Sequence, residues 1–178
     1  DGDGPAAGQA PKVGGMKVYT DVPMKEVQTV AELCGVALEV VLVDDELRKD
    51  KAHAKANVTG RYPLLETPEG TISGIVPICA HISRVSQKLT GGNTPLARAQ
   101  VKQWIGWAQT QLAPTSKLVT GSVFGTHSLF QKDWSSYSKD LKEQVKFLNA
   151  HLSGSPFLCG QALSIADIIV AHALVEPF

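Results

Sequence analysis

The sequence predicts an α/β half followed by an all-α half, and two observations carry this prediction. Runs rich in β-branched and apolar residues, which are typical of strands, concentrate before residue 90 and alternate with helical patterns. After a glycine-rich connection at 91–95, apolar residues recur at helical spacing. The chain has 178 residues, 43% of them hydrophobic. That is enough to bury the core of one domain, or of two small domains that share an interface.

Charge and cysteine content narrow the class of protein. Seventeen basic and seventeen acidic residues give a formal net charge of zero, which does not favour a nucleic-acid-binding surface. No apolar run approaches the ~18 residues of a membrane span. Residues 1–15 are polar and rich in Gly, Pro and Ala, so we expect a flexible lead or linker without a secretory signal, and a cytoplasmic protein. Cys34, Cys79 and Cys159 are widely spaced among apolar neighbours, which indicates free thiols in a reducing compartment.

The first half opens with a strand, a helix and a second strand. The β-rich run Lys17–Thr20 predicts the first strand. From Met24 to Cys34 the apolar residues recur at i, i+3, i+4 and i+7, one face of a helix, and Gly35 predicts its end. Leu38–Val43 is almost continuously apolar and predicts a buried strand. A β-α-β order favours a parallel pair of strands.

The rest of this half adds two helices and a hairpin. The charged segment 44–55 predicts one short, exposed helix. Leu64–Thr67 and Thr71–Ser73 predict two strands, which the short turn between them forces to be antiparallel. A helix is expected over Ile75–Leu89. The resulting order, β-α-β-α-β-β-α, is that of a thioredoxin-like domain.

The second half, residues 94–178, predicts helices. Thr94 is a good cap, and Pro95 suits the first position of a helix with apolar residues along one stripe. Pro114 is expected to end that helix. A second long amphipathic helix is predicted from about residue 135 to residue 152.

The helix predicted over 165–174 is apolar nearly all round, which is typical of a central, buried helix. Ser164 is predicted to cap it. Asp167, three residues later, can reach back to the Ser164 N–H as in a capping box. Residues 119–125 combine β-branched residues with glycines, so their structure stays open.

Several stretches of the chain resemble glutathione transferases. They match the family's first strand, its cis-proline strand, its first C-terminal helix, and its core helix with the exit from it. The resemblance covers roughly residues 16–178 and implies a thioredoxin-like domain at 16–89 and a helical domain at 94–178. The helical domain is shorter than the family's, so we expect it to be truncated. In the same order, the stretches are Val18-Tyr19-Thr20; Gly60–Glu66; Thr94-Pro95-Leu96 with Ala99–Trp107; and Phe157–Ile168 with Val175–Phe178.

Within this superfamily the sequence resembles the transferase-like region of the translation elongation factor 1 gamma subunit. It is also similar to the appendages of aminoacyl-tRNA synthetases and their accessory proteins. This resemblance implies a non-catalytic protein–protein interaction module of the translation machinery. The implied partners are another transferase-like domain, in a homodimer or heterodimer, and translation factor or synthetase subunits. Direct binding of nucleic acid or membrane is not expected. The alternative is an active glutathione transferase, and only that alternative requires glutathione.

A glutathione site in this family has three requirements, and the first is a hydroxyl or thiol near the end of the first strand that stabilises the thiolate. Tyr19 and Thr20 are the hydroxyl residues there, but neither has a neighbouring base in the sequence. We therefore treat them as weak candidates and assign no catalytic residue. The second requirement is the backbone of the residue before a cis-proline, which the resemblance places at Tyr62-Pro63.

The third requirement is an acidic residue followed by Ser at the start of the helix after the hairpin. The resemblance places Gly74 and Ile75 there, and Ser73 lies two residues before the position of the Ser. Each missing hydrogen bond costs about 1–3 kcal/mol. The sequence therefore predicts at most a vestigial glutathione site, formed by Tyr62, Pro63, Ser73, Gly74 and Ile75. The five histidines have no metal-ligand spacing, so we expect no metal site.

Overall fold

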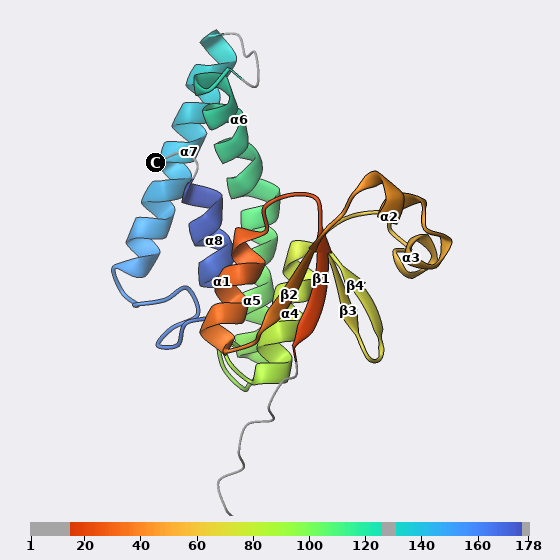
Figure 1. The fold of residues 1–178 in the computed structure, drawn as a ribbon. Coiled ribbons are helices and arrows are strands. Elements are labelled where there is room, and N and C mark those ends of the chain that lie inside the picture. Colours follow the sequence, from red (N-terminus) through yellow and green to blue (C-terminus); the bar gives the residue numbers. More distant parts are fainter. Residues whose placement is uncertain (1–14, 126–130, 176–178) are drawn as a thin grey trace, which may run out of the picture.

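The computed structural model describes residues 15–125 and 131–175, and its first half is built on a mixed four-stranded sheet (Figure 1). The strand order is β2-β1-β3-β4. β1 is parallel to β2 and antiparallel to β3, and β3 is antiparallel to β4. The predicted parallel opening pair and antiparallel hairpin are therefore confirmed. The strands are β1 (Met16–Thr20), β2 (Leu38–Leu42), β3 (Leu64–Thr67) and β4 (Gly70–Ser73).

Two helices cover one face of this sheet and pack on each other. They are α1 (Lys25–Cys34) and α4 (Ile75–Ser86). α1 buries the predicted apolar stripe and ends at Gly35 in the left-handed conformation. α4 ends three residues earlier than predicted, because Gln87 adopts φ 57° and closes the helix. The first half thus has the predicted thioredoxin-like arrangement.

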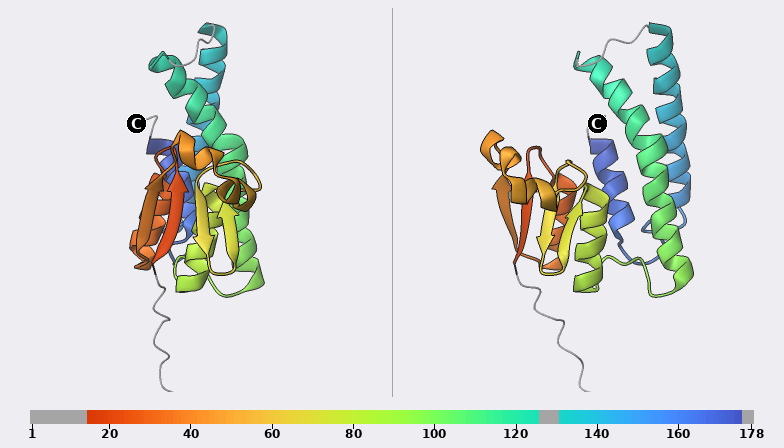
Figure 2. Two further views of the ribbon diagram at one scale, coloured as in Figure 1. Left: turned by 45° about the vertical axis from the view of Figure 1, so that its right-hand side comes forward. Right: turned by 90° about the vertical axis from the view of Figure 1, so that its right-hand side faces the viewer.

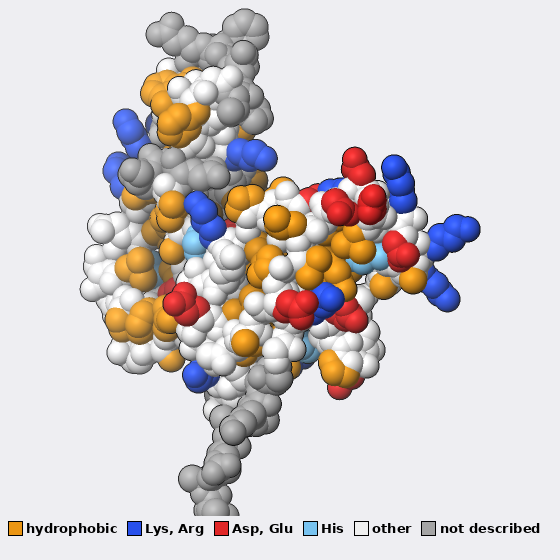
Figure 3. Space-filling view, viewed as in Figure 1, with side chains coloured by type: hydrophobic (Ala, Val, Ile, Leu, Met, Phe, Trp, Pro, Cys, Tyr) orange, Lys and Arg blue, Asp and Glu red, His pale blue; other side chains and the backbone are white. Residues whose placement is uncertain are grey.

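The charged segment after β2 forms two helices rather than the single helix predicted. They are α2 (Asp45–Lys49) and α3 (Lys51–Ala56). Asp50 is extended between them, and its side chain accepts a hydrogen bond from the His53 N–H, which caps α3. The Asp44 side chain caps α2 in the same way through the Leu47 N–H. Acidic and basic side chains lie next to each other on this projection (Figure 3).

β2 differs from the buried strand that its apolar sequence predicted. It lies at the edge of the sheet and pairs with β1. Val40 is 43% exposed and Leu42 is 77% exposed. The edge position leaves these side chains without a neighbouring strand on one side, which an apolar run alone does not reveal.

The second half is helical, as predicted, and its longest helices rise above the sheet half (Figure 2). Pro114 does not end the first of them. The chain continues from α5 through a π-helical turn, η1, into α6, with Pro114 in the first turn of α6, where its missing N–H is tolerated. Residues 119–125, whose structure the sequence left undecided, are therefore helical as far as Val123. The elements are α5 (Pro95–Trp107), η1 (Ala108–Leu112), α6 (Ala113–Val123), α7 (Gln131–Leu152) and α8 (Ile165–Val175).

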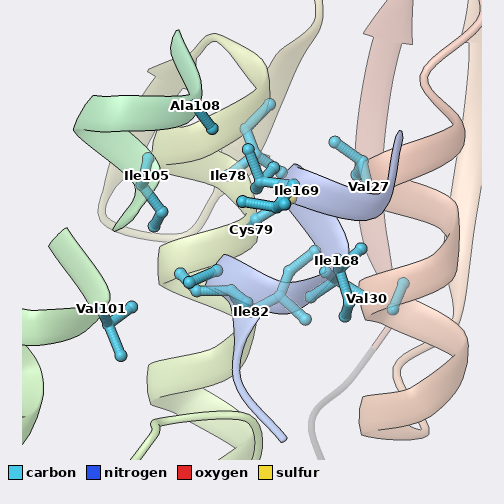
Figure 4. Close-up of a cluster of buried hydrophobic side chains, with 14 of the residues drawn as sticks. Val27, Val30, Ile78, Cys79, Ile82, Val101, Ile105, Ala108, Ile168 and Ile169 are labelled. Atoms are coloured by element: carbon cyan, nitrogen blue, oxygen red, sulfur yellow. The ribbon is translucent and has the colours of Figure 1, made fainter. Parts of the chain in front are cut away.

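α8 lies at the centre of the molecule and joins the two halves. It packs on α1 and α4 from the first half and on α5, η1 and α6 from the second. Ile168 and Ile169 of α8 lie among side chains of α1 and α4 (Figure 4). Residues 165, 166, 168, 169 and 170 are all buried. The predicted central helix is therefore confirmed.

The connection between the halves is packed rather than free. Gly91 is buried, and a Cβ at this position would come within 2.4 Å of a Val101 methyl and 3.3 Å of the Ser164 Cβ. Thr90 pairs with Ser164 through an isolated β-bridge. We retain the division near residues 90–94 as a proposal. The predicted lead, 1–15, and the exit segment, Val175–Phe178, lie almost entirely outside the described residues.

Candidate functional site

The residues of the predicted vestigial site meet at one corner of the sheet. The Tyr62–Pro63 peptide bond is cis, in agreement with the family resemblance. The Gly74 N–H donates to the Pro63 carbonyl at 2.8 Å, which joins the proline loop to the start of α4. Ser73 lies beside them at the end of β4, and its hydroxyl accepts a hydrogen bond from Thr59 Oγ1 at 2.8 Å.

The start of α4 has no side chain suited to hold a carboxylate or an ammonium group. Gly74 occupies the N-cap position, no side-chain hydrogen bond caps the helix, and Ile75 is the first helical residue. Gly74 has φ 97° and ψ 147°, a conformation that only glycine adopts readily. An acidic side chain at position 74 would therefore require a different backbone as well as a different residue.

The two hydroxyls at the end of β1 already donate to other groups. Tyr19 donates to Glu66 Oε2 at 2.8 Å. Burial of the Tyr19 ring and then this hydrogen bond raise the pKa of Tyr19 above its ordinary value. Thr20 is buried and donates to the Val22 carbonyl at 2.6 Å. Neither O–H is therefore left to stabilise a thiolate in this arrangement.

At the start of α8, Asp167 accepts three hydrogen bonds. One oxygen accepts from the Ser164 N–H at 2.8 Å and from the Ser164 hydroxyl at 2.7 Å. The other accepts from the Leu158 N–H at 2.7 Å. Asp167 thus reaches back as a capping box requires, while the Ser164 hydroxyl donates to this carboxylate. The motif fixes the loop before α8 against the helix.

Comparisons with known proteins agree with this architecture. The family described as glutathione S-transferase, C-terminal domain, matches residues 122–175. A glutathione S-transferase-I bound with lactoylglutathione superposes with a TM-score of 0.74 at 23% identity, covering 90% of this chain and 82% of that one. Human glutathione-S-transferase T1-1 in its apo form has a TM-score of 0.72 at 20% identity, covering 92% of this chain and 74% of that one. The described structure therefore has the fold of glutathione transferases, and residues 122–175 match that family's C-terminal domain.

Similar curated proteins carry a more specific description. Elongation factor 1-gamma of Drosophila melanogaster is 29% identical over 133 residues, covering 75% of this chain and 30% of that protein. Elongation factor 1-gamma of Trypanosoma cruzi is 32% identical over 118 residues, covering 65% and 28%. A probable elongation factor 1-gamma of Arabidopsis thaliana is 29% identical over 143 residues, covering 78% and 34%. The chain thus spans about a third of the length of these relatives.

A side-chain cluster beside the cis-proline was not anticipated from the sequence. His53 Nε2 lies 2.9 Å from the Tyr62 hydroxyl, and the His53 ring centroid lies 4.8 Å from that of Tyr19. The Arg48 guanidinium lies over the Tyr62 ring, 5.1 Å from its centroid, and is paired with Asp21. The capping signals at positions 44 and 50 could have indicated the bend that brings α2 and α3 to this corner. The cluster gives Tyr62 a structural role in this transferase-like chain.

Two cysteines of this transferase-like chain have raised thiol pKa values, which lowers the thiolate fraction of each. Burial raises the pKa of the Cys79 thiol to about 12. Burial also raises the pKa of Cys159, against a smaller lowering effect of the Ser164 hydrogen bond.

Over residues 15–125 and 131–175 no three His, Cys, Asp or Glu side chains are grouped so that they could hold a metal ion. None of the described helices is long and apolar enough to cross a membrane.

Proposed function

We propose that this chain is a non-catalytic interaction module of the translation machinery, corresponding to the transferase-like region of elongation factor 1 gamma. The observation that carries the proposal is the start of α4. There Gly74 and Ile75 offer no side-chain hydrogen bond, and the backbone of Gly74 resists replacement by an acidic residue. The loss of two partners for the γ-glutamyl group would lower glutathione affinity by orders of magnitude.

The other glutathione contacts support the same proposal. The Tyr19 hydroxyl donates to the Glu66 carboxylate, and the negative charge of this carboxylate would repel a thiolate bound beside Tyr19. Thr20 donates to the backbone. The Pro63 carbonyl accepts a hydrogen bond from the Gly74 N–H, so the proline loop has a structural role in holding β3 against the start of α4. Since fold alone does not decide function, these features favour an interaction role over catalysis.

The proposed partners are another transferase-like domain, in a homodimer or heterodimer, and subunits of the elongation factor 1 complex. A scaffold of this kind raises the effective concentration of a tethered subunit. The identities of 29–32% to elongation factor 1-gamma proteins favour this complex over the synthetase complex. A cytosolic location is part of the proposal and agrees with three free cysteines.

The first experiment tests catalysis. The protein is passed over immobilised glutathione and assayed for conjugation of glutathione to a chlorodinitrobenzene-type electrophile. We expect no retention beyond that of a control protein and no glutathione-dependent turnover. Turnover that Tyr19→Phe or Thr20→Val abolishes would contradict the proposal and support an active transferase.

A second experiment tests the interaction role directly. The purified chain is mixed with the recombinant nucleotide-exchange subunit of elongation factor 1, and complex formation is followed by size-exclusion chromatography with light scattering. We expect a complex of defined stoichiometry. If this subunit does not bind, while a synthetase subunit carrying a transferase-like domain does, the assignment moves to the synthetase complex.

A further inference from the structure

The two edges of the sheet differ in how they are covered. At the β4 edge, the Thr71 hydroxyl donates to the Ala56 carbonyl at 2.6 Å, and Thr59 Oγ1 donates to the Ser73 hydroxyl at 2.8 Å. The segment after α3 therefore lies against β4. β2 forms the other edge, and no described strand pairs with its outer side. In the left-hand view of Figure 2, β2 lies at the border of the sheet away from the β3–β4 hairpin.

The backbone of β2 points unpaired polar groups toward the open edge. The Ala37 carbonyl accepts from the Met16 N–H, and the Val43 N–H donates to the Thr20 carbonyl, so these two odd-numbered residues face β1. Beside a parallel neighbour, successive residues point their N–H and C=O groups alternately to the two sides of the strand. The even-numbered residues of β2 therefore point these groups away from β1, and no hydrogen bond outside the β1–β2 ladder uses them among the described residues. They are Leu38, Val40 and Leu42.

Two of these residues also have exposed apolar side chains. Val40 lies beside Val18, and Leu42 lies beside Thr20; both of these β1 residues are buried. Val40 and Leu42 therefore point to the face of the sheet that the helices cover, but the edge position leaves them 43% and 77% exposed. An apolar strand with unpaired backbone groups is a template for pairing with another chain.

This edge lies in an acidic part of the chain. Residues 26–47, which form α1, β2 and the start of α2, include six acidic residues and no Lys, Arg or His. Residues 44–46 follow β2 directly, are all acidic and are all exposed. Glu39 belongs to β2 itself and lies 3.6 Å from Lys17 of β1. The charge of this edge therefore favours a basic ligand. The six acidic residues are Glu26, Glu32, Glu39, Asp44, Asp45 and Glu46.

We propose that the outer edge of β2 binds an extended, basic segment of a protein partner, which adds a fifth strand to the sheet. Its backbone pairs with the outward N–H and C=O groups of β2, and its apolar side chains lie beside Val40 and Leu42. Its cations face Glu39 and residues 44–46. This proposal deepens the interaction role above and rests on it, since it names the chemistry of the partner.

Three other occupants fit this edge less well. A second copy that paired through its own β2 would bring two acidic segments together, because a two-fold contact places the same patch on both sides. An amphipathic helix satisfies its backbone groups internally, so it would leave those of β2 unpaired. Nucleic acid would bring its own negative charge to the carboxylates. A basic strand satisfies the backbone groups, the apolar side chains and the charge.

The test is a titration of the full chain with a labelled peptide of about ten alternating Val and Lys residues, which as a strand has valines on one face and lysines on the other. Fluorescence anisotropy measures binding at about 0.1 M salt. Leu42→Lys places a like charge at the edge and should weaken binding at least about tenfold. Val58→Lys is the matched control, because it adds the same charge at an apolar residue that is 90% exposed in the loop after α3. This control should change the affinity by less than about twofold.

Two N-methylated peptides test the backbone pairing. The amides of alternate residues point to opposite sides of a strand, so only one set, that of the valines or that of the lysines, can face β2. Methylation of the set that faces β2 removes its hydrogen bonds and should weaken binding at least about tenfold. Methylation of the other set removes none and should weaken binding by less than about threefold. The sensitive set is that of the valines for an antiparallel strand and that of the lysines for a parallel one.

A further peptide tests the charge. With glutamate in place of lysine, the alternating peptide should bind at least about tenfold more weakly, because it meets the acidic edge with like charge. Four results would each overturn the proposal: no binding of the Val/Lys peptide, equal binding of the glutamate peptide, equal affinities of the two methylated peptides, or equal losses in the Leu42→Lys and Val58→Lys proteins.

The same variants separate this proposal from the proposed function. If the Leu42→Lys protein binds the elongation factor 1 subunit with unchanged affinity, the edge proposal is wrong and the interaction role stands. If the unaltered protein binds neither that subunit nor a synthetase subunit, the interaction role itself is wrong. Circular dichroism spectra of both variants should match that of the unaltered protein, because the substituted side chains are exposed.

Discussion

The N-terminus of α8 is fixed by side chains, whereas that of α4 is fixed by backbone alone. At α8, one carboxylate accepts three hydrogen bonds and ties the preceding loop to the helix. At α4, a glycine with φ 97° receives no side-chain cap, and its N–H bonds to the Pro63 carbonyl. Both helices pack in the same core.

The difference separates what the fold requires from what glutathione binding requires. The α8 cap lies beside the connection between the two halves, so its loss would loosen the packing of both. The α4 start lies at the corner that we propose as a vestigial glutathione site, and there the structure shows a backbone turn without a side-chain cap. The two helix starts therefore differ in the polar side chains that hold them, although both helices belong to the same core.

The largest expected effect comes from breaking the α8 cap. Asp167→Ala leaves the N–H groups of Leu158 and Ser164 without their acceptor, so the free energy of unfolding should fall by about 3 kcal/mol. Urea denaturation followed by circular dichroism measures the change. Glu32→Ala is the control, since this exposed α1 carboxylate has no side-chain hydrogen bond among the described residues, and it should stay within about 0.5 kcal/mol. Equal effects of the two variants would contradict a structural role for the cap.

A pair of glycine substitutions compares the two regions directly. Gly91→Ala places a methyl 2.4 Å from Val101 in a residue with φ 69°, so we expect a loss of at least about 2 kcal/mol. Gly74→Ala meets Pro77 only at 3.5 Å, so the cost is that of φ 97° with ψ 147°, about 1–3 kcal/mol, without the steric overlap that Gly91→Ala adds. Thermal or urea unfolding of both variants gives the ranking. A larger loss at Gly74 would show that the α4 start, rather than the connection beside α8, is the less tolerant of the two.

The start of α8 could be predicted from the sequence because the signals that specify it lie close together in the chain. Ser164 and Asp167 have the spacing of a capping box, and the run after them is apolar on every face. The missing polar pair at Gly74 and Ile75 could be inferred only through the family resemblance, since a glycine followed by an isoleucine has no diagnostic meaning alone. The left-handed backbone of Gly74 required the structure.

The incorrect predictions have causes that the local pattern of apolar and charged residues does not reveal. The apolar run of β2 predicted burial, but its place at the sheet edge depends on the order of strands. Pro114 predicted a helix end, but a π-helical turn lets the chain continue. The His53–Tyr62 contact depends on the bend at Asp50, which the charged pattern of the segment concealed.

Cysteine reactivity compares the burial of α4 with the burial of the loop before α8. Cys79 lies inside α4 with no exposure and a pKa of about 12, whereas Cys159 lies in the loop before α8 and is half-buried. The thiolate is the reactive form, so Cys79 should not react with a thiol reagent at pH 8 in the native state. Cys159 should react first, and Cys34 and Cys79 only on unfolding. Mass spectrometry of the labelled peptides checks this order, and labelling of Cys79 in the folded protein would contradict the packing of α4 on α1.

The smallest expected effect concerns Tyr19, beside the α4 corner. Burial and the hydrogen bond to Glu66 raise its pKa, so this hydroxyl should titrate above its ordinary value of about 10. The folded state favours the protonated tyrosine, so this contribution to stability is present below the unfolded pKa and is lost as the pH rises through the folded pKa. Glu66→Gln removes the charge and should lower the Tyr19 pKa, although burial still raises it. The absorbance difference between the unaltered protein and Tyr19→Phe isolates this titration. An unchanged curve in Glu66→Gln would mean that the carboxylate does not hold the Tyr19 proton, which would reopen this hydroxyl as a donor to a thiolate.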